Sequence, residues 1–199
     1  MNDDNSCLFH SIAYIFERGS GVQALRQMVA KTIATNPIDY NEAILGKPVS
    51  QYNSWIQSKD SWGGAIELAI FSSHYQTEIW SLDVSTLRVD KFGEGCGYDK
   101  VAVLFYSGIH YDAVAVSPVA GTGEDLKEFD LTVFGRDQAE REVMKAIVQL
   151  GRVWQAKHKF TDLARFALRC DVCKEGIVGQ KEAQAHAMAT GHSSFVEYS

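Results

Sequence analysis

Four residues near the carboxyl end have the types and spacing of a metal site. Cys170 and Cys173 form a Cys-x2-Cys pair, and His186 and His192 follow it. Two thiolates on a tight turn and two imidazoles on a following helix can close a tetrahedron around Zn²⁺. The pattern predicts a structural zinc site. The alternative is a reduced cysteine pair beside two surface histidines.

The segment between these ligands has the size of a small zinc finger, with Ile177 and Ala183 at the positions of its minimal core. Its two lysines, Lys174 and Lys181, are outnumbered by three acidic residues, and the whole chain has a net charge of −6. Binding to the nucleic-acid backbone requires a basic surface. We therefore expect no nucleic-acid partner and assign the finger a structural or protein-binding role.

A third cysteine, Cys7, lies where a nucleophile can be activated. It begins a run whose apolar residues recur at helical spacing, namely Leu8, Ile12, Ile15 and Phe16. The positive end of a helix dipole stabilises a thiolate in the first turn. The position favours a catalytic cysteine, and a buried, inert thiol is the alternative.

His110 is the histidine best placed to serve that thiol. It lies in the sequence Ser-Gly-Ile-His-Tyr-Asp at 107–112, between two expected strands. Asp112 follows two residues later and on a strand shares a face with His110, so its carboxylate can orient the imidazole. A Cys7–His110–Asp112 triad for nucleophilic catalysis is one interpretation, and an ordinary turn is the other.

The elements that must position these residues follow from the period of the apolar pattern. It predicts leading helices, then short strands, then a last strand and a long amphipathic helix. This order indicates an α/β (α+β) fold with a central, mostly antiparallel sheet flanked by helices. The expected helices are 7–18, 22–35, 39–45, 49–56, 63–75 and 136–159, and the expected strands are 78–82, 87–89, 101–105, 113–116 and 129–134.

Composition shifts divide the chain into four parts. We expect a catalytic domain at 1–117, a linker with the final strand of the catalytic region at 118–135, a connecting amphipathic helix at 136–165, and the finger and tail at 166–199. No apolar run reaches the roughly 18 residues that span a membrane, so no membrane partner is expected. A 199-residue chain that is 46% hydrophobic needs no disulfides, which favours the cytoplasm, with the nucleus as a second location.

Three separated motifs and the finger resemble one known family. Residues 4–10, Asp-Asn-Ser-Cys-Leu-Phe-His, resemble the nucleophile loop of the ovarian-tumour (OTU) family of deubiquitinating cysteine proteases. Residues 62–68 resemble the start of that family's central helix, and 108–112 resemble its histidine loop. The finger is similar to that of the zinc-finger-bearing subgroup. The resemblance implies a papain-like OTU domain followed by a small C-terminal zinc finger.

The resemblance also implies roles for single residues. Cys7 corresponds to the nucleophile, His110 to its base, Asp112 to the group that orients His110, and Asp4 to an active residue that shapes the nucleophile loop. The active site needs no metal. The residues expected to line the substrate are Trp62, Gly63, Gly64, Ile109 and Tyr111, and for Trp62 and Tyr111 ordinary packing is the alternative.

The activity implied by the resemblance is thiol-dependent hydrolysis of isopeptide bonds in polyubiquitin. The subgroup acts with a hexameric AAA ATPase of endoplasmic-reticulum-associated degradation (ERAD), which links it to the unfolded protein response. The ubiquitin-like domain that recruits this ATPase is absent from this chain. The first 120 residues carry 8 Lys/Arg and 13 Asp/Glu, which suits the arginine-rich tail of ubiquitin. The alternative is a non-catalytic ubiquitin-binding adaptor with a structural zinc finger.

Overall fold

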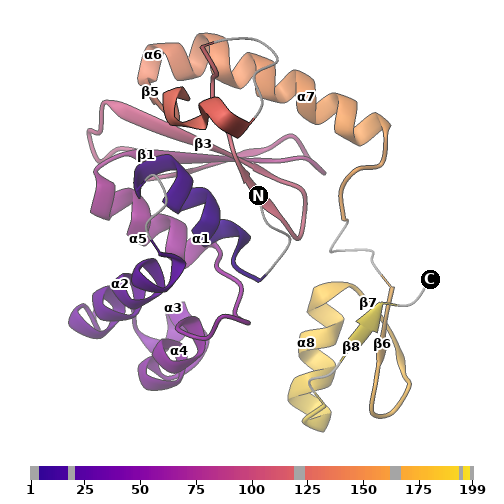
Figure 1. Ribbon diagram of the computed structural model, residues 1–199. Coiled ribbons are helices and arrows are strands. Elements are labelled where there is room, and N and C mark those ends of the chain that lie inside the picture. Colours follow the sequence, from indigo (N-terminus) through magenta and orange to yellow (C-terminus); the bar gives the residue numbers. More distant parts are fainter. Residues whose placement is uncertain (1–4, 18–20, 119–123, 162–166, 193–194, 198–199) are drawn as a thin grey trace.

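The computed structural model describes residues 5–17, 21–118, 124–161, 167–192 and 195–197 (Figure 1). In this part of the chain, a five-stranded sheet lies between two layers of helices, and a three-stranded sheet with one helix forms a separate C-terminal unit. No helix among the described residues is both long enough and apolar enough to cross a membrane.

The large sheet has the strand order β2-β1-β3-β4, with β5 also paired to β3. Every pairing is antiparallel except the central one between β1 and β3. Since β2 turns back on β1 and β3 then lies on the other side of β1, β3 runs in the same direction as β1. The mostly antiparallel sheet is confirmed, with one parallel pair at its centre. The strands are β1 (Glu78–Asp83), β2 (Val89–Phe92), β3 (Lys100–Tyr106), β4 (Tyr111–Ala113) and β5 (Val133–Gly135).

The first face of the sheet is covered by the N-terminal helices, below the sheet in Figure 1. Alternate residues of β3, Ala102 and Leu104, join the core that these helices form. The helices are α1 (Cys7–Ile12), its π-helical continuation η1 (Ala13–Glu17), α2 (Val22–Thr35), α3 (Glu42–Leu45), α4 (Val49–Ile56) and α5 (Ala65–Tyr75). The predicted helices at 22–35 and 49–56 have these bounds.

The second face is covered by α6 (Arg136–Gln138), η3 (Ala139–Val143) and α7 (Met144–Ala156). The other residues of β3, including Val103 and Phe105, pack here with Ile147. The helix expected as a connector therefore forms a layer of the fold. Along α7, Ile147 and Gly151 are buried, whereas Leu150 is 42% exposed.

Several expected elements begin later than predicted, and for two of them a turn or a cap explains the shift. The strand expected at 87–89 is β2, which begins at Val89. A turn occupies 84–86, where Asp83 accepts a hydrogen bond from the backbone N–H of Ser85, and Leu87 after it has a positive φ of 57°. The helix expected at 39–45 begins at Glu42, because Asn41 caps it by accepting hydrogen bonds from two of its first N–H groups.

The segments on either side of the expected linker also differ from the prediction. The strand expected at 113–116 is β4, which ends at Ala113, and the strand expected at 129–134 is β5, which begins at Val133. Val116 and Leu131 nevertheless pair as an isolated bridge. Residues 124–129 form the 3₁₀ helix η2 (Glu124–Phe129), and the linker's 119–123 lie outside the described residues.

The C-terminal unit contains β6 (Ala167–Cys170), β7 (Gly176–Val178), α8 (Gly179–Thr190) and β8 (Phe195–Glu197). Ile177 and Ala183 form its small core with Leu168 and Cys170, as the sequence predicted.

The segment between α7 and this unit is attached to the histidine loop. Thr161 N–H donates to the carbonyl oxygen of Ser107 over 2.8 Å. Gly108, with a φ of +103°, lies against the Thr161 carbonyl so closely that a Cβ at Gly108 would come within 2.1 Å of its oxygen. This close approach requires glycine, and it fixes the path of the chain as it leaves the large domain.

Candidate active site and metal centre

Cys7, the first residue of α1, opens into a cleft of about 750 Å³. All five residues predicted to line the substrate also line this cleft, namely Trp62, Gly63, Gly64, Ile109 and Tyr111. The cleft therefore joins the nucleophile segment, the start of α5 and the histidine loop, which are far apart in the sequence. Of the predicted catalytic residues, Asp4 lies outside the described part of the chain.

Packing of α1 against β4 brings Cys7 to the histidine loop. Ser11, one turn after Cys7, donates its hydroxyl hydrogen to the carbonyl oxygen of Tyr111 over 3.1 Å. His110 lies between Ile109 and Tyr111, and both of these neighbours line the cleft with Cys7. A sulfur and an imidazole about a hundred residues apart in the sequence are therefore brought to the same end of the sheet.

The histidine loop is a tight turn between β3 and β4, closed by a 3.0 Å hydrogen bond from Ser107 N–H to the His110 carbonyl. The Nε2 atom of His110 lies 3.3 Å from Oδ1 of Asp112. This contact confirms the predicted proximity of the two side chains, which line a neighbouring hollow of about 470 Å³. With Nε2 at the carboxylate, Nδ1 is the ring nitrogen that can accept a proton from the thiol.

The wall opposite the histidine loop begins at Trp62. Its indole N–H donates to the side-chain oxygen of Asn5 over 2.6 Å, which ties the wall to the nucleophile segment. Gly63 follows, and a Cβ there would come within 2.6 Å of the Leu8 side chain and 3.1 Å of the Phe9 ring. Because both side chains are buried, glycine is what lets this wall approach α1.

Glu67, in the first turn of α5, fixes the end of the same wall. One of its carboxylate oxygens accepts from Gly64 N–H over 2.7 Å, and the other accepts from the Tyr52 hydroxyl over 2.7 Å. Burial raises the pKa of Glu67, against the opposing effects of these two hydrogen bonds and the charge of Arg26. The buried carboxyl thus belongs to a hydrogen-bonded network beneath the cleft.

Two stacked tyrosines form the aromatic side of the cleft. The rings of Tyr106 and Tyr111 lie 4.4 Å apart at 27°. Burial, then the charge of Asp83 and then that of Cys7, raises the pKa of Tyr106 to about 12. Burial also raises the pKa of Tyr111, with smaller contributions from Tyr106 and Cys7. Both phenols are therefore neutral at physiological pH, and both lie within electrostatic range of the thiol.

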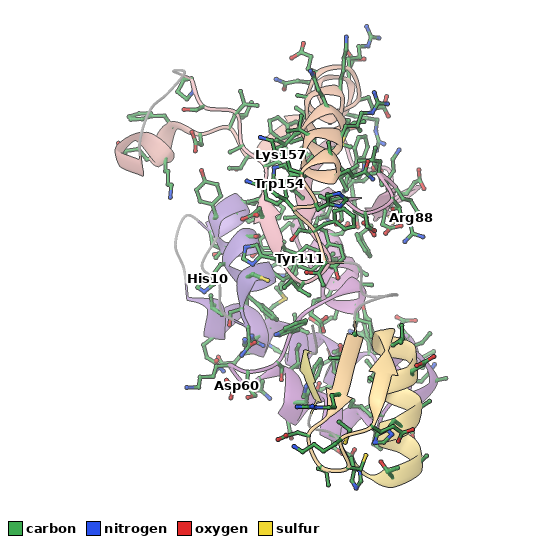
Figure 2. The ribbon with its side chains drawn as sticks, turned by 90° about the vertical axis from the view of Figure 1, so that its right-hand side faces the viewer. His10, Asp60, Arg88, Tyr111, Trp154 and Lys157 are labelled. Carbon is green, nitrogen blue, oxygen red and sulfur yellow. The ribbon has the colours of Figure 1, made fainter. Side chains whose placement is uncertain are left out.

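Several cleft residues were missed by the sequence analysis, namely Tyr52, Trp55, Tyr106, Leu168 and Ala183. Tyr106 could have been found as the last residue of the strand before the histidine loop. Leu168 and Ala183 belong to the C-terminal unit and carry no such signal, because only the fold places them at the cleft. Figure 2 looks onto this side of the molecule, where Tyr111 lies above the C-terminal unit.

The four predicted metal ligands converge in the C-terminal unit, where their donor atoms all lie within 4.8 Å of one another. The Cys170 sulfur is 3.7 Å from Nδ1 of His192, and the Cys173 sulfur is 3.4 Å from Nε2 of His186. A tetrahedral zinc site with ordinary bond lengths separates sulfur and nitrogen by about 3.6 Å. The donor set and its spacing therefore fit Zn²⁺.

Glu175, which the sequence analysis did not identify, contacts one of the four predicted ligands from outside the site. Its carboxylate lies 3.1 Å from Nδ1 of His186 and so fixes which nitrogen faces the sulfurs. Burial opposes ionisation of Cys170, but hydrogen bonds from the backbone of Cys173 and Val172 and from neighbouring side chains lower its pKa to about 6. A thiolate is the form that binds a metal ion.

Two protein families match this chain. Residues 2–113 match the family described as OTU-like cysteine protease. Residues 164–198 match the family described as the C-terminal C2H2-type zinc finger of ubiquitin thioesterase OTU1. The first match covers Cys7, the start of α5 and the histidine loop. The second covers all four converging cysteines and histidines, together with Leu168 and Ala183 of the cleft lining.

Similar proteins include the ovarian tumor domain-containing deubiquitinating enzyme 2 of Arabidopsis thaliana, which is 44% identical over 98% of this chain and 94% of the relative. Ubiquitin thioesterase OTU1 of Danio rerio is also 44% identical over 98% of this chain, but the chain spans only 64% of that relative's length. A solved structure of an OTU domain in complex with ubiquitin has a TM-score of 0.71 and 35% identity, over 81% of this chain and 87% of the other.

Proposed function

Because this chain belongs to the OTU family of cysteine proteases, we propose that it is a cysteine-type deubiquitinase that hydrolyses isopeptide bonds in polyubiquitin. One observation carries the proposal. Cys7 lies in a cleft together with the two residues that flank His110, and His110 is paired with Asp112. This is the arrangement that activates a thiol for attack on an amide carbonyl.

The reaction follows from these positions. His110 accepts the thiol proton through Nδ1, and the Cys7 sulfur attacks the carbonyl carbon of the ubiquitin C-terminal glycine, which is bonded to the lysine nitrogen. The lysine amine leaves with the proton from His110, and a thioester remains on Cys7. Water, deprotonated by His110, then cleaves the thioester and releases the ubiquitin carboxylate. Asp112 holds the imidazole in the tautomer that this exchange needs.

The shape of the cleft supports a tail that ends in two glycines. Trp62 is 52% exposed and Ile109 is 44% exposed, so apolar surface remains accessible in the cleft that contains Cys7. Because bulky side chains line the cleft near Cys7, the remaining space suits a peptide segment whose residues have no side chains. We assign the five predicted lining residues to this tail, in particular to the residues nearest the scissile bond.

A ubiquitin probe with a thiol-reactive group at its C-terminus tests the proposal against a non-catalytic adaptor. We expect a covalent adduct on Cys7, because the reactive group at the end of the ubiquitin tail is attacked by an activated thiol bound next to it. Mass spectrometry of the peptide that contains Cys7 identifies the adduct. Cys96, which is exposed, serves as an internal control and stays unmodified. Ubiquitin binding without any adduct would support the adaptor instead.

The C-terminal unit is a C2H2-type finger, and we propose that Cys170, Cys173, His186 and His192 hold a structural Zn²⁺ in it. Its core contains only a few apolar side chains, so bound metal contributes much of its folding free energy. Removing the metal with a chelator is expected to unfold this unit, seen as a loss of α8 helicity in hydrogen exchange. Cleavage of a minimal ubiquitin substrate should persist, since the proposed chemistry uses Cys7 and His110, but with a raised KM because Leu168 and Ala183 no longer line the cleft. Immediate loss of that cleavage would assign the metal a further role.

We also propose that the protein acts in the cytoplasm in ERAD, with a hexameric AAA ATPase as its partner. The proposal is supported by the similarity to ubiquitin thioesterases of the OTU1 type and by the finger that this chain shares with them. None of the four cysteines, all of which lie in described segments, forms a disulfide, as suits a reducing compartment. Copurification of the ATPase with the protein from cells would support the partnership, and its absence would contradict it.

A further inference from the structure

Arg26 of α2 is completely buried, and its guanidinium joins three separate segments. Nη1 donates to the carbonyl oxygen of Ile56, at the end of α4, over 2.8 Å. Nη2 donates to the carbonyl oxygen of Ser61 over 2.8 Å, just before the Trp62–Gly64 wall. The same nitrogen reaches the nucleophile segment, through the Ser6 hydroxyl oxygen at 3.0 Å and the Asn5 carbonyl oxygen at 3.3 Å.

The contact with Ser6 differs from what a serine at this position usually makes. Ser6 is the N-cap residue of α1, where a serine hydroxyl commonly accepts a hydrogen bond from the backbone of the first turn. Here the side chain makes no capping hydrogen bond, and its oxygen accepts from Arg26. Arg26 thus determines the orientation of the residue immediately before Cys7.

A second contact fixes the guanidinium itself. Its central carbon lies 4.0 Å from the centroid of the Phe9 ring, which is also fully buried. The side chain is therefore held between an aromatic face in α1 and the carbonyl oxygens of the opposite wall. Movement of either segment would break hydrogen bonds to a buried charge, which is costly.

Arg26 is not among the residues that line the cleft, so it acts through the residues that do. Its guanidinium donates hydrogen bonds to Asn5 and Ser6, which precede Cys7, and to Ser61, which precedes Trp62. Two segments that line the cleft are therefore held by the same side chain. The guanidinium therefore helps to set the distance between the nucleophile segment and the wall, from beneath the cleft, together with the Trp62–Asn5 hydrogen bond. An apolar residue could fill the space but could not bond to three carbonyl oxygens and one hydroxyl.

We propose that Arg26 is a positioning residue for isopeptide hydrolysis, because it holds the Asn5–Cys7 segment and the Ser61–Gly64 wall at the separation that the reaction requires. The inference rests on the proposed function. Misplacement of a reacting group by about 1 Å can lower a rate about 10²-fold without loss of substrate binding. The effect of Arg26 should therefore appear in kcat more than in KM.

The test compares Arg26→Lys with Ile33→Ala in the full chain, using the ubiquitin dimer that the wild-type protein cleaves best. Ile33 lies in the same helix and is fully buried, but it belongs to the apolar core. At a temperature where both variants are folded by circular dichroism, we expect Arg26→Lys to lower kcat by about 10- to 100-fold with KM within about threefold. Ile33→Ala should lower the melting temperature and leave kcat within about threefold of wild type. A folded Arg26→Lys variant with wild-type kcat would overturn the proposal.

Ser6→Ala keeps the test decisive if Arg26→Lys does not fold. This variant removes one acceptor of the guanidinium and leaves the charge in place, so we expect a kcat reduced severalfold with little change in melting temperature. A wild-type kcat for Ser6→Ala in that case would overturn the proposal. Failure of the proposed function is a separate result, because the wild-type protein would then cleave no ubiquitin dimer.

Discussion

Cys7→Ala is expected to reduce the cleavage of ubiquitin dimers by about 10⁴-fold or more, to the level of the uncatalysed reaction in this assay. The reason is that no thioester can form without the sulfur, and a methyl group at the start of α1 offers no replacement. The small side chain is tolerated at this half-exposed position, so the fold and the affinity for ubiquitin should be kept. Gel-based cleavage assays and ubiquitin binding by calorimetry measure the two effects separately.

Cys96→Ala is the matched control for this substitution. Cys96 is the other cysteine outside the finger, and it is exposed in a turn away from the described cleft lining. We expect its removal to leave cleavage unchanged. Retained turnover in Cys7→Ala, or loss of turnover in Cys96→Ala, would contradict the assignment of the nucleophile.

His110→Ala is expected to produce a loss of similar size, because the thiol then lacks both its base and the acid that protonates the departing lysine amine. The effects of the two substitutions on the cleavage rate should not be additive. A Cys7→Ala/His110→Ala double variant should be no slower than either single variant, since residues that act as one unit lose their joint effect when either is removed.

His74→Ala controls for the removal of an imidazole elsewhere. His74 lies exposed near the end of α5, with its ring against Tyr75. Cleavage by this variant should match that of the wild type. Substantial turnover by His110→Ala would mean that another group accepts the proton of the Cys7 thiol, and the proposed exchange of one proton would be wrong.

Local sequence predicted the residues at the site better than the boundaries of the elements. Gly-Ile-His-Tyr-Asp at 108–112 predicted that His110 and Asp112 lie close together, and the 3.3 Å contact between them confirms it. Strand ends were less accurate, as at Leu87 and Val116, because apolar type alone does not tell whether a residue lies in a strand or in the loop beside it.

Arg26 had a sequence signal that the analysis did not use. It lies among the apolar residues Leu25, Val29 and Ile33 of α2, all of which are buried, so it occurs within the inner stripe of the helix. A charged residue in such a stripe is rarely fully buried without partners. The signal predicts a buried hydrogen-bonding role, but the partners at Asn5, Ile56 and Ser61 cannot be read from it.

The sequence by itself determined the chemistry of this protein, because the types of Cys7, His110, Asp112 and the four finger ligands, with their local spacing, restrict what each group can do. The tertiary structure decided which groups share one cleft. A parallel central pair of strands brings the histidine loop to the start of α1, a buried guanidinium joins the two sides of the floor, and two finger residues reach the same cleft. These contacts join residues up to about 180 positions apart in the sequence. They depend on the packing of apolar faces and on the hydrogen bonding of buried polar groups throughout the fold, which local sequence does not specify.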